Sequence, residues 1–228
     1  MRRTALLTLA AAALSALVVG AITATAGNDG RSMPQMPRMH HTMHTSKAAT
    51  LTASDLRNTL NQLLGEHAVL AMNATNLGVT GSKAFPAAAK TLDENSVALS
   101  QAIGSLYGAK AGKTFLDGPF MWRAHVKFFV DYTVATAKRD EAAKAQAVAN
   151  LKTYTVRFGD FLAGATGLPK LAVRNDLLGH VLELKTQLDD YAAHRYAKAA
   201  DDYRHAYAHM FMTGDLLAGA IAQQKNLK

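Results

Sequence analysis

Apolar residues recur at steps of three and four along most of the chain after Thr50, a spacing that places them on one face of an α-helix. No segment alternates Val, Ile or Thr with polar residues in the two-residue period of a strand. Gly, Pro and capping residues interrupt the helical pattern and divide the region into six predicted helices. These helices cover Ser54 to Leu77, Pro86 to Tyr107, a segment after Asp117-Gly118-Pro119 to about Lys138, Asp140 to Ala165, Pro169 to about Ala192, and Tyr196 to near Gln223.

The predicted fold is all-α: an up-and-down bundle of about six helices that occupies residues 51–228. Its two halves resemble each other, with pseudo-repeats at about 54–138 and 140–223. Ala124-His125-Val126 and the later Asp131 match Ala208-His209-Met210 and Asp215 at a constant offset of 84. Two copies are too few for a solenoid, so we expect two duplicated three-helix halves that share one core.

The first 26 residues have the pattern of a signal peptide. Arg2 and Arg3 precede an apolar run from Ala5 to Ile22, and Ala24-Thr25-Ala26 provides a cleavage site of small residues. An uncleaved signal anchor is the alternative, because the apolar run is nearly long enough to span a bilayer. Cleavage predicts an exported protein without a transmembrane segment, located in the periplasm, outside the cell or at the cell surface.

The absence of cysteine and the net charge of the chain limit the kinds of metal site and binding partner that we expect. The chain contains no cysteine, which excludes disulfides, a lipid-attachment cysteine and thiolate metal sites. Loss of the signal peptide would lower the formal charge from +8 to +6. This surplus is spread along the chain and is not interleaved with aromatic residues, so it fits an anionic cell envelope better than nucleic acid.

Residues 27–50 form a predicted disordered tail that is rich in methionine and histidine. Pro34 and Pro37 oppose helix formation, and the flanking segments consist mostly of small and polar residues. Thioether sulfur and imidazole nitrogen suit Cu(I), whereas hard ions prefer oxygen ligands. We therefore expect a copper-binding tail, the alternative being a polar leader with an accidental methionine content. The candidate ligands are Met33, Met36, Met39, His40, His41, Met43 and His44.

Four further histidines lie on apolar faces of four different predicted helices: His67, His125, His180 and His209. A buried imidazole must form hydrogen bonds or bind a metal, because unpaired polar nitrogens are costly in a dry core. Two interpretations stay open. The histidines could be core residues satisfied by carboxylates, backbone or water, or they could form a metal site between helices. In the second case the expected outer carboxylates are Glu66, Asp131 and Asp215.

Two long motifs resemble the signatures of a poorly characterised family of exported bacterial helical proteins. They are Trp122-Arg123-Ala124-His125 followed by residues 128–133, and residues 206–215, with Leu63-Leu64-Gly65-Glu66-His67 as a shorter match. The resemblance covers nearly the whole chain after Thr50 and implies export and a helical fold. Members often carry the label copper amine oxidase, but this chain lacks the Asn-Tyr pair that the quinone of that enzyme requires. It also departs from the family at residues 117–120, which interrupt an otherwise continuous helix.

The leading functional hypothesis is an exported metal-binding protein that sequesters or delivers copper. The alternative is a structural or interaction module of the cell envelope with no metal in the bundle, and an uncharacterised enzyme comes third. The sequence contains no Glu-x-x-His pair of a di-iron bundle, no Gly-x-Ser-x-Gly and no P-loop. No catalytic residues are therefore assigned.

Overall fold

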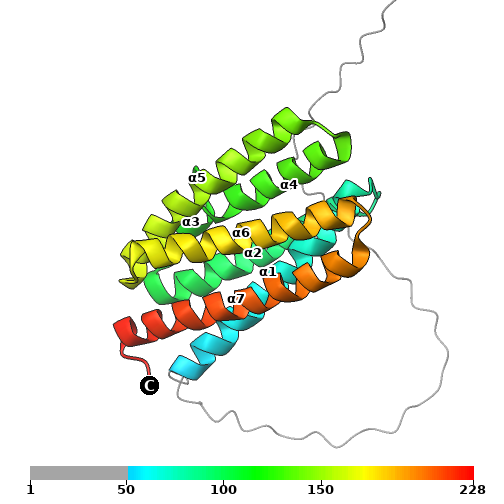
Figure 1. The fold of residues 1–228 in the computed structure, drawn as a ribbon. Coiled ribbons are helices and arrows are strands. Elements are labelled where there is room, and N and C mark those ends of the chain that lie inside the picture. The colour runs from blue at the N-terminus through cyan, green and yellow to red at the C-terminus, as the bar shows by residue number, and fades with distance from the viewer. Residues whose placement is uncertain (1–50) are drawn as a thin grey trace, which may run out of the picture. The chain divides into compact units, whose positions relative to one another are not determined.

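The computed structural model describes residues 51–228, which belong to one compact unit (Figure 1). The expected signal peptide (1–26) and the expected Met/His-rich tail (27–50) lie outside the described residues. The described chain is helical nearly throughout and contains no strand, so the predicted all-α bundle is confirmed.

Seven helices make up the bundle, one more than the sequence predicted. The six predicted helices are all present, with ends within a few residues of the expected positions. The additional helix is short and follows the second. In chain order they are α1 (Ala53–Val79), α2 (Phe85–Tyr107), α3 (Ala109–Leu116), α4 (Trp122–Lys138), α5 (Glu141–Thr166), α6 (Lys170–Ala192) and α7 (Tyr196–Lys225).

Local chemistry explains where the longer helices begin and end. Thr52 caps α1: its hydroxyl accepts from the Asp55 amide at 3.0 Å, and the Asp55 carboxylate accepts from the Thr52 amide at 3.1 Å. Asp140 caps α5 by accepting from the Ala143 amide. At the other end of α5, Gly167 takes a left-handed φ of 75°, which a residue with a side chain adopts only at a cost.

The short helix α3 was missed because eight residues are too few for a helical period to stand out. It is held by packing. The Ser100 hydroxyl donates to the Gly112 carbonyl at 2.9 Å, and a Cβ on Gly112 would lie 2.4 Å from the Ser100 carbonyl oxygen. This close approach of α3 to α2 directs Phe115 into the core, where its ring stacks on Trp122.

Five helices form a closed ring in the order α1, α7, α6, α5 and α4, and α4 returns to α1. The helix α1 also contacts α6 across this ring, and α2 packs along α1 (Figure 1). The ring encloses a core whose largest fully buried side chains include Tyr132, Tyr154 and Phe158. Because α1, α4 and α6 all face this core, polar residues on their inner faces are brought together away from water.

The two halves of the bundle pack differently. A duplication would make α4 the counterpart of α7 and α2 the counterpart of α6. The helix α7 packs along α6, but α4 has few contacts with α2 and lies instead against α5 and α1. This difference counts against a repeated packing arrangement, and the internal duplication stays a prediction. Over residues 51–228, no helix combines the length and the apolar character needed to cross a bilayer.

Candidate metal centre

Three of the four predicted core histidines meet in the middle of the bundle: His67 of α1, His125 of α4 and His180 of α6. Each is at most 4% exposed. One ring nitrogen from each lies within 4.8 Å of the nitrogens offered by the other two. The ring centre of His67 is 5.4 Å from that of His125 and 6.0 Å from that of His180. We refer to these three residues as the histidine triad.

The helical period places each triad member in the core. On α1, His67 follows Leu60 and Leu64 on the buried seam and precedes Ala71. The other two occupy equivalent places in the buried seams of their helices, between Trp122 and Phe129 on α4 and between Leu177 and Leu184 on α6. The imidazoles therefore stand where the pattern would normally place an apolar side chain.

Three of the six ring nitrogens of the triad are buried without a hydrogen-bond partner. His67 Nδ1 and both ring nitrogens of His180 are buried without one. His125 Nδ1 contacts the carbonyl oxygen of Trp122, which can only accept, so this nitrogen carries the proton and Nε2 keeps its lone pair. Leaving a buried polar group unpaired costs about 1–3 kcal/mol. The triad is thus a local source of instability that a bound ion would reduce, since the ion takes one nitrogen from each ring.

Burial keeps the triad neutral. It lowers the pKa of His125 to about 3, with a further contribution from the neighbouring His180. Burial likewise holds the pKa values of His67 and His180 well below the usual 6.5, and the adjacent imidazoles lower them further. The neutral imidazole is the form that binds metal ions, so the triad is ready to act as a ligand set at neutral pH.

A small cavity of about 20 Å³ lies between the three rings. This is room for one water molecule or one ion. Apart from the triad, Thr75 is the one polar residue that lines it, and the Thr75 hydroxyl already donates to the Met72 carbonyl at 3.2 Å. The remaining lining is aliphatic or aromatic. His180 also borders a second apolar cavity of about 30 Å³.

Aromatic side chains fix the orientation of the triad. Trp122, the single tryptophan of the chain, has its ring centre 4.8 Å from His67 and 4.7 Å from His125. The indole donates to the Ser96 hydroxyl at 3.2 Å, which fixes the ring plane. On another side, Tyr154 stacks on His125 with ring centres 4.6 Å apart. These contacts restrict two of the three imidazoles before any ligand arrives.

The interruption at residues 117–120 sets the start of α4 and thereby the position of His125. Arg123 donates to Asp93 of α2 at 2.7 Å and to Asp117 at 2.5 Å, which ties the first turn of α4 to its neighbours. Phe120 takes a left-handed φ of 62°. The chain therefore turns sharply and begins a new helix one turn before His125, with Trp122 already in the core.

His209, the fourth expected ligand, lies apart from the triad and has a different chemistry. Its Nδ1 donates to Glu183 at 2.8 Å, and its Nε2 is 3.3 Å from Asp176. The hydrogen bond to Asp176 and then that to Glu183 raise the pKa of His209 to about 9. The ring is consequently a cation that holds two anions. Its centre lies 6.3 Å from that of His180.

Gly179 of α6 leaves room for the ring of His209 between its two carboxylates. A Cβ at this position would lie 2.9 Å from His209 Cε1. Asp176, Gly179 and Glu183 form one stripe of α6 that faces α7, and the Thr213 hydroxyl adds a bond to Asp176 at 2.9 Å. The stripe that holds His180 is adjacent and faces the core. We refer to His209, Asp176 and Glu183 as the ion cluster.

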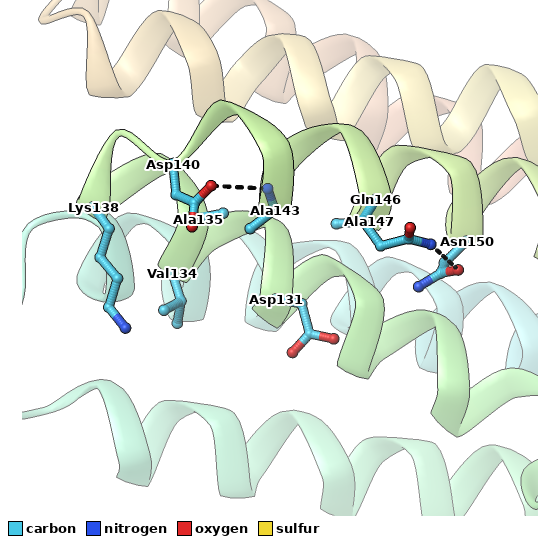
Figure 2. A pocket seen from close by; sticks show the side chains of 9 residues that line it. All are labelled: Asp131, Val134, Ala135, Lys138, Asp140, Ala143, Gln146, Ala147 and Asn150. Atoms are coloured by element: carbon cyan, nitrogen blue, oxygen red, sulfur yellow. Dashed lines mark hydrogen bonds between the residues drawn. The ribbon is translucent and has the colours of Figure 1, made fainter. Parts of the chain in front are cut away.

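The carboxylates expected behind the triad have other partners. Glu66 accepts from Asn95 at 2.8 Å, and Asp215 accepts from Asn61 at 2.9 Å. Asp131 pairs with Lys127 at 2.7 Å on the surface. Figure 2 shows Asp131 among residues that line a hollow of about 360 Å³ between α4 and α5. The expected outer shell therefore differs from the structure, because each of these residues lies on a helix face turned away from the core.

Sequence analysis did not identify Asp176, Trp122 or Tyr154 as part of this region. A signal for Asp176 was present, since Asp176, Gly179 and Glu183 follow one another at helical steps. The tail residues Met33, Met36, Met39, His40, His41, Met43 and His44 lie outside the described part of the chain.

No protein-family model, no curated protein and no solved structure matches this chain. The resemblance to exported bacterial helical proteins therefore stays a prediction.

Proposed function

We propose that this chain is an exported metal-binding protein that holds a copper ion on His67, His125 and His180. The observation that carries the proposal is the convergence of three neutral imidazoles whose buried nitrogens are largely without partners. Polar groups that are buried without hydrogen bonds destabilise a fold, so a bound ligand is the simplest account of three in one place. An ion between them would replace the missing hydrogen bonds with coordination bonds.

The donor set supports copper among the transition metals. Imidazole nitrogen suits copper and zinc, and the described cavity offers no carboxylate that would favour magnesium, calcium or manganese. The Met/His-rich segment at residues 33–44 adds soft donors within the same chain. In this proposal the tail captures the ion outside the cytoplasm and the triad stores it, which amounts to sequestration or delivery of copper.

The experiment compares the copper content of the full-length protein with that of two variants. His180→Leu removes one ligand and breaks no hydrogen bond, because neither nitrogen of His180 has a partner. His205→Ala removes an exposed imidazole of α7 and serves as the matched control. We expect His180→Leu to lose the core-bound ion and the control to retain it. Equal copper content in all three proteins would overturn the proposal for the bundle.

The single tryptophan allows the core to be followed separately from the tail. Trp122 lies against two of the three ligands, so its fluorescence should change when an ion enters the triad. A variant in which the tail methionines become leucine and the tail histidines become glutamine should keep this fluorescence response. Loss of the response in that variant, with the triad intact, would show that the triad does not bind the ion on its own.

A further inference from the structure

We infer that the triad is selective for a monovalent ion, Cu(I), bound by three nitrogens without a fourth ligand, and that it excludes Zn(II) and Cu(II). This inference rests on the proposed metal-binding function and specifies the ion. It is argued from the number of donors, the charge of the site and the shape of its surroundings.

The donor count favours an ion that accepts three ligands. Zn(II) takes four, and a site with three protein ligands completes its coordination with water. A water in the 20 Å³ cavity would need two to four polar partners. Apart from the imidazoles, the Thr75 hydroxyl is the one polar partner at hand, and its oxygen can still accept although it donates to the Met72 carbonyl. The cavity has room for one ion or one water and not for both. The cavity therefore supports a fourth ligand poorly, whereas Cu(I) is stable with three.

The charge of the site also favours a monovalent ion. Three neutral imidazoles add no charge, so the filled triad carries the full charge of its ion. The solvation energy lost on burial scales with the square of that charge, which makes the cost for a divalent ion about four times that for a monovalent one. An anionic ligand would reduce this cost for Zn(II), and no carboxylate lines the described cavity.

The charged groups beside His180 offset one positive charge. The ion cluster beside His180 contains one imidazolium and two carboxylates, and therefore carries a net charge of −1. The side chains of His209 and Asp176 are only 11% and 19% exposed, and that of Glu183 is 36% exposed. Their field acts on the triad through His180. A monovalent ion in the triad would leave the pair of sites neutral overall, whereas a divalent ion would not.

The aromatic contacts disfavour oxidised copper. Cu(II) prefers square-planar or tetragonal surroundings, often with additional ligands. The indole of Trp122 and the ring of Tyr154 pack against His125, and the indole also packs against His67. These rings cannot swing apart to open a further position without disturbing the core. The triad should consequently hold copper in its reduced state.

Trp122 fluorescence tests the inference in the metal-free, full-length protein. We would titrate with Ag(I), a redox-inert probe for Cu(I), in halide-free buffer, and in parallel with Zn(II) and Cu(II). Saturable quenching of Trp122 by Ag(I) is expected at concentrations at least tenfold below any response to Zn(II) or Cu(II). The same Ag(I) titration of His180→Leu should show no saturable phase, whereas His205→Ala should behave as the wild type.

The outcomes separate this inference from the proposed function. If Zn(II) or Cu(II) binds the triad as tightly as Ag(I), the selectivity for a monovalent ion is overturned and metal binding stands. If none of the ions changes Trp122 fluorescence or the ring signals of the triad in NMR spectra, both proposals fail. His67→Leu provides a second ligand variant if His180→Leu does not retain the helical circular dichroism of the wild type.

Discussion

Two groups of histidine lie side by side in this bundle, and α6 contributes to both. The histidine triad is neutral, has an apolar lining and leaves at least three buried nitrogens unpaired. The ion cluster is charged, and both nitrogens of His209 face carboxylates. The face of the helix on which a histidine lies decides whether it is a neutral imidazole in an apolar core or a cation beside carboxylates. The same residue type is therefore a proposed metal ligand in one region and a structural ion in the other.

The largest expected effect is the stabilisation of the fold by Ag(I), which should depend on the triad and not on the ion cluster. Ag(I) present at about one hundred times its dissociation constant should stabilise the wild type by roughly 2.7 kcal/mol, because it binds the folded state alone. His180→Leu should lose the part of this stabilisation that arises from the triad. The measurement is urea denaturation with and without Ag(I) in the variant that lacks the tail donors. An equal silver effect in His180→Leu would remove the distinction between the regions.

The second prediction concerns the ion cluster. His209→Leu leaves Asp176 and Glu183 facing each other without a cation and breaks both bonds to the ring. We expect a loss of about 1.5–3 kcal/mol in the free energy of unfolding, the range for hydrogen bonds to charged groups. Ag(I) quenching of Trp122 should persist at silver concentrations no higher than those needed for the wild type, because the two carboxylates beside His180 remain and the competing cation is gone. A variant of wild-type stability would show that the cluster is not a structural ion site.

The two regions should respond to pH in opposite directions. The pKa of His209 is raised to about 9, so its stabilisation is complete below about pH 6.5 and is lost as the pH rises through 9. The pKa values of the triad are lowered, so the unfolded chain binds more protons than the folded chain below pH 6.5, and stability falls as the pH falls. One titrating group changes stability by at most about 1.4 kcal/mol per pH unit. Denaturation of the metal-free protein from pH 5 to 10 measures the free energy of unfolding on both the acid and the alkaline side. The variant His209→Leu should lose only the decrease on the alkaline side.

Replacement of a triad histidine by leucine is expected to stabilise the metal-free protein slightly. His180→Leu replaces a buried ring with two unpaired nitrogens by an apolar side chain of similar size. The metal-free variant should be more stable than the wild type by roughly 1 kcal/mol, since the desolvation cost disappears. Urea denaturation in the presence of a chelator measures the difference. Substantial destabilisation would show that His180 is a satisfied core residue, as in the alternative interpretation of the sequence.

The smallest effect tests the carboxylates that sequence analysis placed behind the imidazoles. Asp131→Asn breaks an exposed pair with Lys127, and pairs of this kind on a helix contribute about 0.3–0.5 kcal/mol. Stability should fall by no more than this amount, and Ag(I) quenching of Trp122 should be unchanged. A weakened silver response would connect Asp131 to the triad after all.

Most of the fold could be predicted because the six longer helices carry a strong apolar period and clear end signals such as Asp140 and Gly167. The same period identified His67, His125 and His180 as core residues. It could not show that His209 faces Asp176 and Glu183, because local sequence does not determine which helices pair or at what separation. For the same reason Glu66, Asp131 and Asp215 looked available as outer ligands although they lie on other faces.

Gly179 and His180 are neighbours in the chain but belong to different regions, the ion cluster and the triad. Two adjacent positions therefore indicate the state of both regions. Any larger residue at position 179 would collide with the ring of His209 and displace it from its carboxylates while leaving His180 unchanged. In a set of related sequences, the residue at position 179 would therefore report on the ion cluster, and the residue at position 180 would report independently on the triad. Loss of the glycine would mark chains in which the ion cluster is rearranged, and loss of the histidine would mark chains that lack the proposed metal site.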